Sequence, residues 1–179
     1  MAANIRHRDH LIHIAVFAML GVIMYLSDIL MEFLPNVHLV GVLVIVYTVV
    51  YRFRALIPIY GYVLLNGLLS GFGIWWLAYL YVWAVLWGLV MLVPRRIPNK
   101  VRYVIYTALC ALHGFSFGLL YVPVQMIYNS SIEYIISWLS IGFVTADIYH
   151  GIGNCIFGAL LIAPLSSLLL RLEKNIRLV

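Results

Sequence analysis

Residues 55–94 read ALIPIYGYVLLNGLLSGFGIWWLAYLYVWAVLWGLVMLVP, and these 40 residues contain no Asp, Glu, Lys or Arg. A transmembrane helix needs about 20 predominantly apolar residues, so this stretch is long enough for two membrane-spanning helices. A second uncharged stretch of 30 residues, 103–132, is long enough for one long helix. Together the two stretches predict an all-α membrane protein.

The composition of the whole chain agrees with a lipid environment. Of the 179 residues, 65% are apolar and 9% are charged, and the mean hydropathy is +1.07. A soluble domain carries roughly a quarter charged residues, which is enough polar surface to face water on all sides. The first apolar run continues too far for a cleavable signal peptide and is expected to be a retained helix.

Six spans are predicted in a single integral membrane domain, residues 1–179. The segment 128–145 has apolar residues at helical spacing and is expected to be a short interfacial or re-entrant piece. The two cysteines, Cys110 and Cys155, fall inside spans and are interpreted as packing thiols. The predicted spans are 11–32, 38–51, 55–71, 74–93, 103–127 and 146–170.

Basic residues occur in four clusters, all on the same side of a six-span chain. The positive-inside rule makes that side cytoplasmic, so both termini are predicted to be cytoplasmic, in the inner (plasma) membrane of a bacterium. The net charge of +5 is then an orientation signal, and no nucleic-acid partner is expected. The clusters are Arg6 and Arg8; Arg52 and Arg54; Arg95, Arg96, Lys100 and Arg102; and Arg171, Lys174 and Arg177.

The sixth predicted span opens with polar residues on one helical face. Asp147, His150 and Asn154 follow at i, i+3 and i+7, which places a carboxylate, an imidazole and an amide in a row that enters the membrane from outside. Polar groups at that depth must face protein or a cavity. The row predicts a ligand pocket, and the alternative is an interhelical hydrogen-bond network that holds the bundle together.

Aromatic residues and a second histidine complete the candidate pocket. Tyr79 and Trp83 lie on one face of the fourth predicted span, and Trp83 is too deep for an interfacial aromatic belt. An aromatic wall suits a flat heterocycle, although core packing explains a single Trp equally well. His113 lies in the middle of the fifth span, where a pocket role and a structural role are equally plausible.

Two further patterns point to partners or to catalysis. Ala15, Ala18 and Gly21 form a small-residue stripe that lets another helix approach, either from this chain or from a partner. The segment 114–118 matches G-x-S-x-G, so an intramembrane serine protease using Ser116 and His150 is the alternative function, although Phe117 stands where the rhomboid pattern has Gly. A helical scaffold without a ligand is a third interpretation. The histidines lack metal-ligand spacing, so no metal or cofactor is expected.

The architecture resembles the substrate-binding S components of energy-coupling factor (ECF) vitamin transporters. The resemblance rests on six helices in fewer than 200 residues, the Leu34-Pro35-Asn36-Val37-His38-Leu39 loop and Asp147-x-x-His150-x-x-x-Asn154. It implies a receptor without catalytic activity that docks on a transmembrane coupling subunit driven by two cytoplasmic ATPases. It further implies a micronutrient pocket formed by Trp83, His113, Asp147, His150 and Asn154, with Asn36 and His38 in a lid.

The charge distribution predicts the class of ligand. Asp28, Glu32, Glu133 and Asp147 lie toward the outside, where the sequence offers no Lys or Arg. An anion would be repelled by any ionised carboxylate nearby, since two charges 4 Å apart interact by about 4 kcal/mol in a partly buried site. A neutral or cationic aromatic heterocycle, such as a thiamine-like, pyrimidine, pyridine or purine-like compound, is therefore expected, unless these carboxylates are solvated loop charges.

Overall fold

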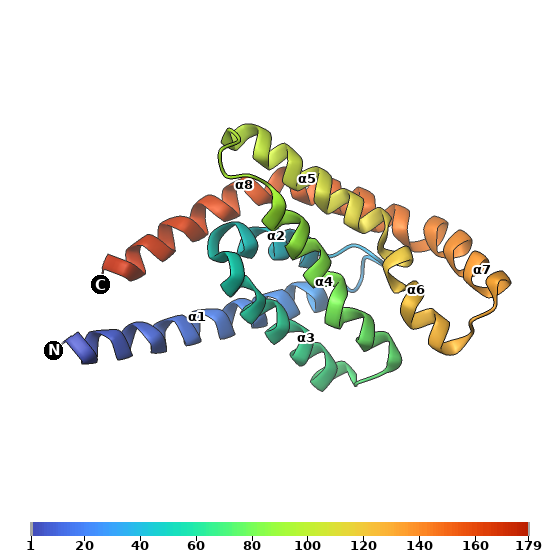
Figure 1. The fold of residues 1–179 in the computed structure, drawn as a ribbon, viewed down its shortest axis with the longest axis horizontal. Coiled ribbons are helices and arrows are strands. Elements are labelled where there is room, and N and C mark those ends of the chain that lie inside the picture. Colours follow the sequence, from blue (N-terminus) through green and yellow to red (C-terminus); the bar gives the residue numbers. More distant parts are fainter. Residues whose placement is uncertain (1, 179) are drawn as a thin grey trace.

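The computed structural model describes the backbone of residues 2–178 and the side chains of residues 11–175. Over these residues the chain forms helices and connecting turns without a strand, which confirms the predicted all-α fold. Figure 1 shows that both termini lie at one end of the bundle. The elements are α1 (Ala2–Leu30), α2 (Val40–Tyr51), η1 (Arg52–Ala55), α3 (Leu56–Ser70), α4 (Ile74–Leu92), α5 (Asn99–Phe115), α6 (Phe117–Tyr128), α7 (Ile132–Gly142), η2 (Phe143–Asp147) and α8 (Ile148–Leu178).

Within the described residues, five helical stretches are long and apolar enough to cross a membrane, where the sequence predicted six spans. The difference arises at α2, because it joins α3 through the 3-10 turn η1 into one stretch, Val40–Ser70. With 12 residues, α2 is about 18 Å long, which is short of the ~30 Å hydrocarbon core. Ten of its residues are buried, so its apolar character reflects enclosure by protein on all sides.

The boundaries of the fifth and sixth predicted spans also differ. The expected helix 103–127 begins earlier, at Asn99, and is interrupted at Ser116, which separates α5 from α6. The expected short piece 128–145 is the beginning of the last helix, because α7 continues through the π-helical η2 into α8. Ser131 caps the start of α7 by accepting a hydrogen bond from the Tyr134 N–H at 3.3 Å.

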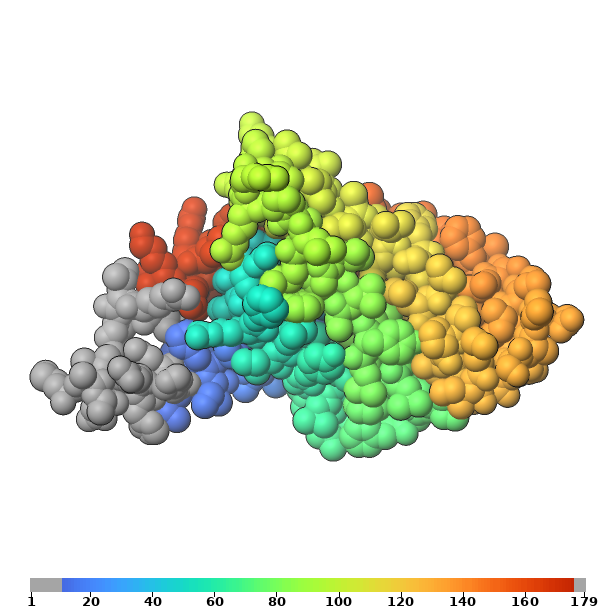
Figure 2. Space-filling view, viewed as in Figure 1, coloured from blue at the N-terminus to red at the C-terminus, as the bar shows by residue number. Residues whose placement is uncertain are grey.

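The hydrophobic core surrounds α2. Phe17 and Met24 of α1, Ile59 of α3, Leu86 of α4 and Ile162 of α8 are buried against it. On the face shown in Figure 2, α4 (green) and α6 (yellow to orange) lie side by side. Two tyrosines join these helices by hydrogen bonds to the backbone: Tyr81 to the Leu120 carbonyl at 2.7 Å and Tyr121 to the Trp75 carbonyl at 3.1 Å.

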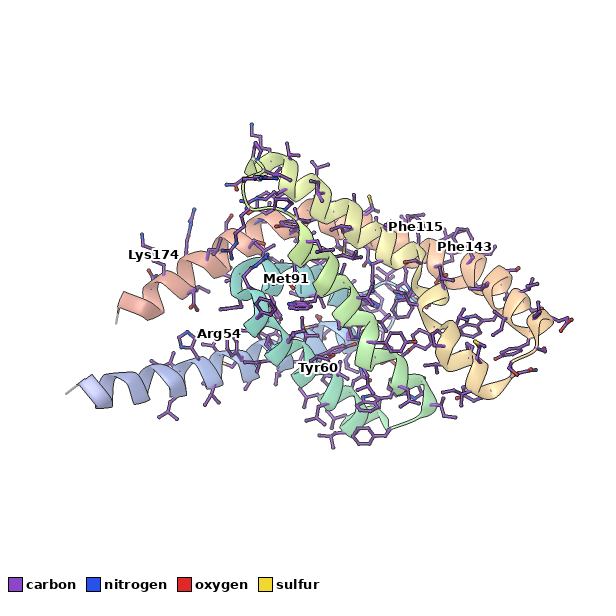
Figure 3. All side chains as sticks on the ribbon, viewed as in Figure 1. Arg54, Tyr60, Met91, Phe115, Phe143 and Lys174 are labelled. Atoms are coloured by element: carbon purple, nitrogen blue, oxygen red, sulfur yellow. The ribbon has the colours of Figure 1, made fainter. Side chains whose placement is uncertain are left out.

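The basic residues that the structure describes gather at one end of the bundle. The Arg52 guanidinium donates to the Met91 carbonyl at 3.1 Å, which connects the cluster after α2 with the end of α4. Figure 3 shows Arg54 and Lys174 on the side of the molecule that holds both termini. The side chains of Arg6, Arg8 and Arg177 lie outside the described residues. Which side of the membrane this end faces stays a prediction.

Candidate ligand-binding site

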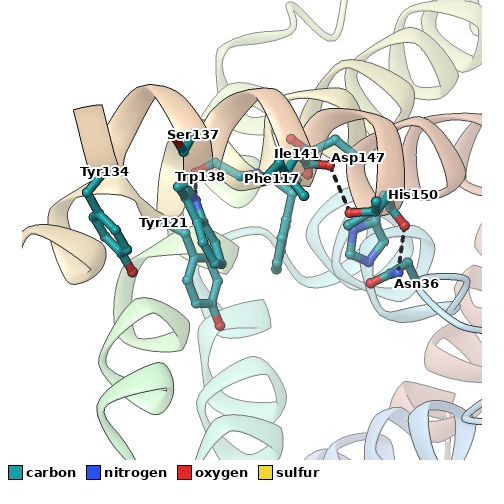
Figure 4. A pocket seen from close by; sticks show the side chains of 13 residues that line it. Asn36, Phe117, Tyr121, Tyr134, Ser137, Trp138, Ile141, Asp147 and His150 are labelled. Atoms are coloured by element: carbon teal, nitrogen blue, oxygen red, sulfur yellow. Dashed lines mark hydrogen bonds between the residues drawn. The ribbon is translucent and has the colours of Figure 1, made fainter. Parts of the chain in front are cut away.

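The first cavity lies between α6 and the continuous helix α7–η2–α8 and has a volume of about 490 Å³. Four aromatic side chains line it, in two pairs at i and i+4: Phe117 and Tyr121 on α6, and Tyr134 and Trp138 on α7. The i, i+4 spacing places each pair on one face of its helix. Figure 4 shows these rings following one another along the cavity toward His150.

Polar side chains stand at the other end of this cavity. Asp147, Asn36 and His150 line it there, from three different elements. Asp147 accepts a hydrogen bond from the Gly118 N–H at 2.9 Å, in the first turn of α6. The carboxylate thus satisfies a backbone donor that the start of a helix leaves unpaired. A Cβ at Gly118 would lie 2.6 Å from Asp147 Oδ2, so the absence of a side chain there permits this contact.

The π-helical segment η2 forms part of the cavity wall. Thr145, Ala146 and Asp147 of η2 line the cavity, and Asn36 donates to the Thr145 carbonyl at 3.4 Å. A π-helical turn holds one more residue than an α-helical turn, and such turns occur frequently at functional sites. Asn36 itself has a φ of 61°, a conformation that Asn tolerates better than most residues. The α1–α2 loop is thereby fixed against the wall of the cavity.

A second cavity of about 460 Å³ lies on the other side of this loop. Its lining is more polar and includes Asp28, Glu32, His38, Asn66 and Tyr79. The Asp28 carboxylate is held by two donors from α3: the Tyr62 hydroxyl at 2.8 Å and the Asn66 amide at 3.3 Å. Three residues, Asn36, Phe117 and His150, line both cavities.

A histidine pair lies at the boundary between the cavities. The Nε2 atoms of His38 and His150 are 2.9 Å apart, and the Nδ1 atom of each ring is buried without a hydrogen-bond partner among the described residues. For two neutral imidazoles, the ring that donates through Nε2 keeps a bare Nδ1 acceptor. The other ring must then carry its proton on Nδ1. The pair therefore always offers one unused donor and one unused acceptor.

Trp83 is the centre of the surrounding ring cluster. It is 1% exposed, and its ring centroid lies 5.9 Å from that of His38, 5.6 Å from His113 and 5.9 Å from Phe117. Its indole Nε1 has no hydrogen-bond partner within the described part of the chain. His113 is satisfied, because its Nε2 lies 3.0 Å from the Val82 carbonyl. The structure thus brings Trp83, His113, His38 and His150 together as one cluster.

Asn154 and Ser116 form hydrogen bonds to backbone carbonyls. Asn154 donates to the Cys110 carbonyl at 3.1 Å, which is the kind of interhelical hydrogen bond that was the alternative to a pocket role. It lines neither cavity. The Ser116 hydroxyl donates to the His113 carbonyl at 3.3 Å. Ser116 lines a third cavity with Asp147, and His150 is absent from that lining.

The predicted small-residue stripe on α1 is divided by the structure. Ala15 and Ala18 are exposed, whereas Gly21 is buried against α3 of the same chain. A Cβ at Gly21 would lie 3.2 Å from the Pro58 carbonyl oxygen. The close approach at Gly21 is therefore an intrachain contact, and a partner surface on this stripe is limited to Ala15 and Ala18.

The aromatic lining of the first cavity was not among the residues selected from the sequence. The i, i+4 spacing of Phe117 with Tyr121 and of Tyr134 with Trp138 is the signal that could have found it. Asp28 and Asn66 come together through the packing of α1 on α3, and no local pattern indicates that contact. No group of three or more His, Cys, Asp or Glu residues is placed to hold a metal ion within the described side chains.

Three comparisons with known proteins were negative. Neither a protein-family model, nor a curated protein, nor a solved structure matches this chain. The function must therefore be argued from the chemistry of the site itself.

Proposed function

We propose that this chain is the membrane-embedded substrate-binding subunit of an ECF-type importer that takes up a neutral or cationic aromatic heterocycle. The observation that carries the proposal is the first cavity, in which four aromatic rings lead to Asn36, Asp147 and His150. A largely apolar cavity with a few convergent polar groups is the usual form of a small-molecule site. The rings offer flat faces for stacking, and the polar end fixes the orientation of the ligand.

The charges around both cavities favour a ligand without negative charge. None of the described lining residues is Lys or Arg, whereas Asp28, Glu32 and Asp147 supply carboxylates. A ligand carboxylate would meet like charge without a compensating cation, at a cost of several kcal/mol at short range. Biotin, pantothenate and folate are disfavoured for this reason. An aromatic cation gains in addition from the electron-rich ring faces.

Import needs an energy source that this sequence does not encode. The chain contains no Walker sequence, so ATP hydrolysis must come from a partner. The resemblance to S components supplies the arrangement that we propose: a transmembrane coupling subunit with two cytoplasmic ATPases, in a bacterial plasma membrane. Long apolar helices fit a multi-pass protein, and the exposed Ala15 and Ala18 provide a surface where another helix can approach closely.

The alternative, an intramembrane serine protease, is less well supported. A serine nucleophile needs its general base within hydrogen-bond reach. Ser116 donates to a backbone carbonyl instead, and it shares no cavity lining with His150. We therefore propose a receptor without catalysis. An activated serine would react with a fluorophosphonate probe, so labelling that disappears in Ser116→Ala would favour the protease.

The proposal is tested with the small molecules that co-purify with the protein. Mass spectrometry identifies the bound compound, and equilibrium dialysis of protein in nanodiscs measures its Kd. We expect Trp138→Ala to weaken binding about tenfold through loss of an aromatic face. Tyr128→Ala is the matched control, because Tyr128 is exposed at the end of α6 and lines neither cavity. A carboxylate vitamin that binds tightly, or equal affinity in both variants, contradicts the proposal.

A further inference from the structure

The two cavities differ in chemistry and meet at a common wall. The first is largely apolar and includes four aromatic rings, and the second contains two carboxylates, two amides and a tyrosine hydroxyl. Asn36, Phe117 and His150 contribute to both linings, so the two cavities share part of one wall. Each volume, about 490 and 460 Å³, falls in the lower part of the range for small-molecule sites.

The second cavity has unused capacity for a hydrogen-bond donor. Asp28 accepts the Tyr62 hydroxyl and the Asn66 amide through Oδ2. An ionised carboxylate offers about four acceptor positions on its two oxygens, so acceptor positions remain after these two bonds. Glu32 adds a second carboxylate to the same lining, and the described lining contains no Lys or Arg to neutralise either of them.

A buried polar group at the common wall also points to a ligand. His150 is 6% exposed, lines both cavities and has an Nδ1 without a partner among the described residues. A buried polar atom left unpaired costs about 1–3 kcal/mol, so such atoms usually have a partner in the functional complex. A ligand that passes His150 from one cavity to the other can supply that partner once the imidazole ring rotates, because the Nδ1 atom has almost no accessible surface in this structure.

We propose that the two cavities are compartments of one site, which binds a single molecule composed of a flat aromatic ring and a protonated amine arm. The ring lies in the first cavity beside Phe117 and Trp138, the arm passes His150, and the ammonium group lies beside Asp28. This inference rests on the proposed function, because it names the substrate class of the same site. Two separate molecules, one in each cavity, are the alternative outcome of the test.

The test uses indoles whose 3-position carries an alkyl arm of two to five carbons. Each arm ends either in an amine, which is protonated at pH 7, or in a hydroxyl group, so the two series differ in charge and match in shape. Calorimetry in nanodiscs measures the Kd of each compound. At the arm length that reaches Asp28, we expect the amine to bind about ten- to hundredfold more tightly than the alcohol.

Variants assign this preference to particular residues. Asp28→Asn should reduce the amine-to-alcohol ratio to near one, since the charge is lost while Asn can still accept a hydrogen bond. Glu133→Gln is the matched control, because Glu133 lies in the first turn of α7 and lines neither cavity. Trp138→Ala should weaken the amine and the alcohol by the same factor.

A competition measurement on the unmodified protein keeps the test independent of how Asp28→Asn folds. Butylammonium should displace the amine-arm indole, and it should displace the more weakly bound alcohol-arm indole of the same length as well, because both arms occupy the same compartment. The inference is overturned if the amine has no advantage at any length, if the advantage survives Asp28→Asn, or if butylammonium and the amine-arm indole bind together. If neither series binds and Trp138→Ala leaves the co-purified compound unaffected, the proposed function itself fails.

Discussion

The two ends of the helical bundle treat their polar groups differently. Helices α3 and α4 run from one end to the other: Arg52 and Arg54 precede α3, and Arg95 follows α4, whereas Asn66 and Tyr79 lie toward the cavities. At the arginine end, side chains bond to backbone carbonyls that helix ends and turns leave free. Arg52 donates to Met91 at 3.1 Å, and Trp87 donates to Arg52 at 3.0 Å.

At the cavity end, buried polar atoms are left without such bonds. Among the described residues, His38 Nδ1, His150 Nδ1 and Trp83 Nε1 are buried without a hydrogen-bond partner, and all three belong to one ring cluster. On α8, toward the arginine end, the buried Ser166 Oγ also lacks a hydrogen-bond partner within the described residues. Buried polar groups in proteins are otherwise paired almost without exception. His38 lines the second cavity and His150 lines both, so the unpaired atoms of the histidine pair lie beside the cavities, whereas Trp83 lines neither.

The largest expected effect concerns the orientation of the two ends. If the arginine end is cytoplasmic, a cysteine at Asn99 should resist an impermeant thiol reagent in intact cells, and one at Ser130 should react completely. The parent protein, with Cys110 and Cys155, measures background labelling. Labelling at Asn99 with protection at Ser130 would invert the topology, and the cavities would then face the cytoplasm.

The next effect concerns the wall of the cavity end. A Cβ at Gly114 would lie 2.7 Å from the backbone carbonyl of His150, so α5 and α8 meet there through their backbones. Gly114→Val should destabilise the protein by about 3 kcal/mol or more, because neither backbone can move aside. Gly88→Ala is the control, since that Cβ would meet nothing within 4 Å. Thermal unfolding in detergent measures both variants, and equal midpoints would contradict the close packing.

The third prediction separates binding from structure on α8. His150→Ala should weaken binding of the co-purified ligand about ten- to hundredfold, because it removes a hydrogen-bonding group from both cavities. Asn154→Leu should instead lower stability by about 1–3 kcal/mol with little change in affinity, since its amide bonds to the Cys110 carbonyl. If only Asn154→Leu loses affinity, Asn154 contacts the ligand and the structural role assigned to it is wrong.

Much of the fold could be predicted because lipid imposes a simple rule on composition. The two uncharged runs, 55–94 and 103–132, located three of the five long helical stretches in outline, and one-face spacing selected His150 and Asp147. The sequence wrongly predicted that α2 is a membrane span of its own, because a helix enclosed by protein and a helix exposed to lipid are equally apolar. Hydropathy reports the absence of water and does not report what replaces it.

The rest of the site depends on contacts that sequence spacing does not encode. The His38–His150 bond joins residues 112 positions apart, and it requires the α1–α2 loop to fold against α8. The break at Ser116 turns Phe117 and Tyr121 toward α7, although the sequence there reads as one continuous apolar helix. The π-helical η2 likewise has no composition of its own that distinguishes it from an α-helix.

The fourth prediction tests the partner surface that we propose on α1. Ala18→Trp should lower uptake about tenfold and leave ligand affinity unchanged, because a bulky side chain prevents a coupling subunit from approaching this exposed position. Ala159→Trp, on the exposed face of α8, controls for added bulk in lipid. Transport of the radiolabelled ligand into proteoliposomes that also contain the proposed coupling subunit and its two ATPases, supplied with ATP, measures the effect. Equal uptake in both variants would remove Ala18 from the docking surface.

The smallest expected effect lies at the arginine end. Arg52→Met removes the hydrogen bond to the Met91 carbonyl and should lower the free energy of unfolding by about 1 kcal/mol, since the bond is only partly buried. Arg52→Gly loses the same hydrogen bond. Because Arg52 has a φ of 56°, which glycine adopts without strain, this variant also relieves about 1 kcal/mol of backbone strain. The Gly variant should therefore be the more stable of the two.

Neither Arg52 variant should change ligand affinity, because Arg52 lines neither cavity. Denaturation in mixed micelles gives the unfolding free energies, and calorimetry gives the Kd of the co-purified ligand. A change in Kd of more than about threefold with unaltered stability would mean that the two ends are energetically coupled. The arginine end would then contribute to ligand recognition, and binding would no longer depend on the cavity end alone.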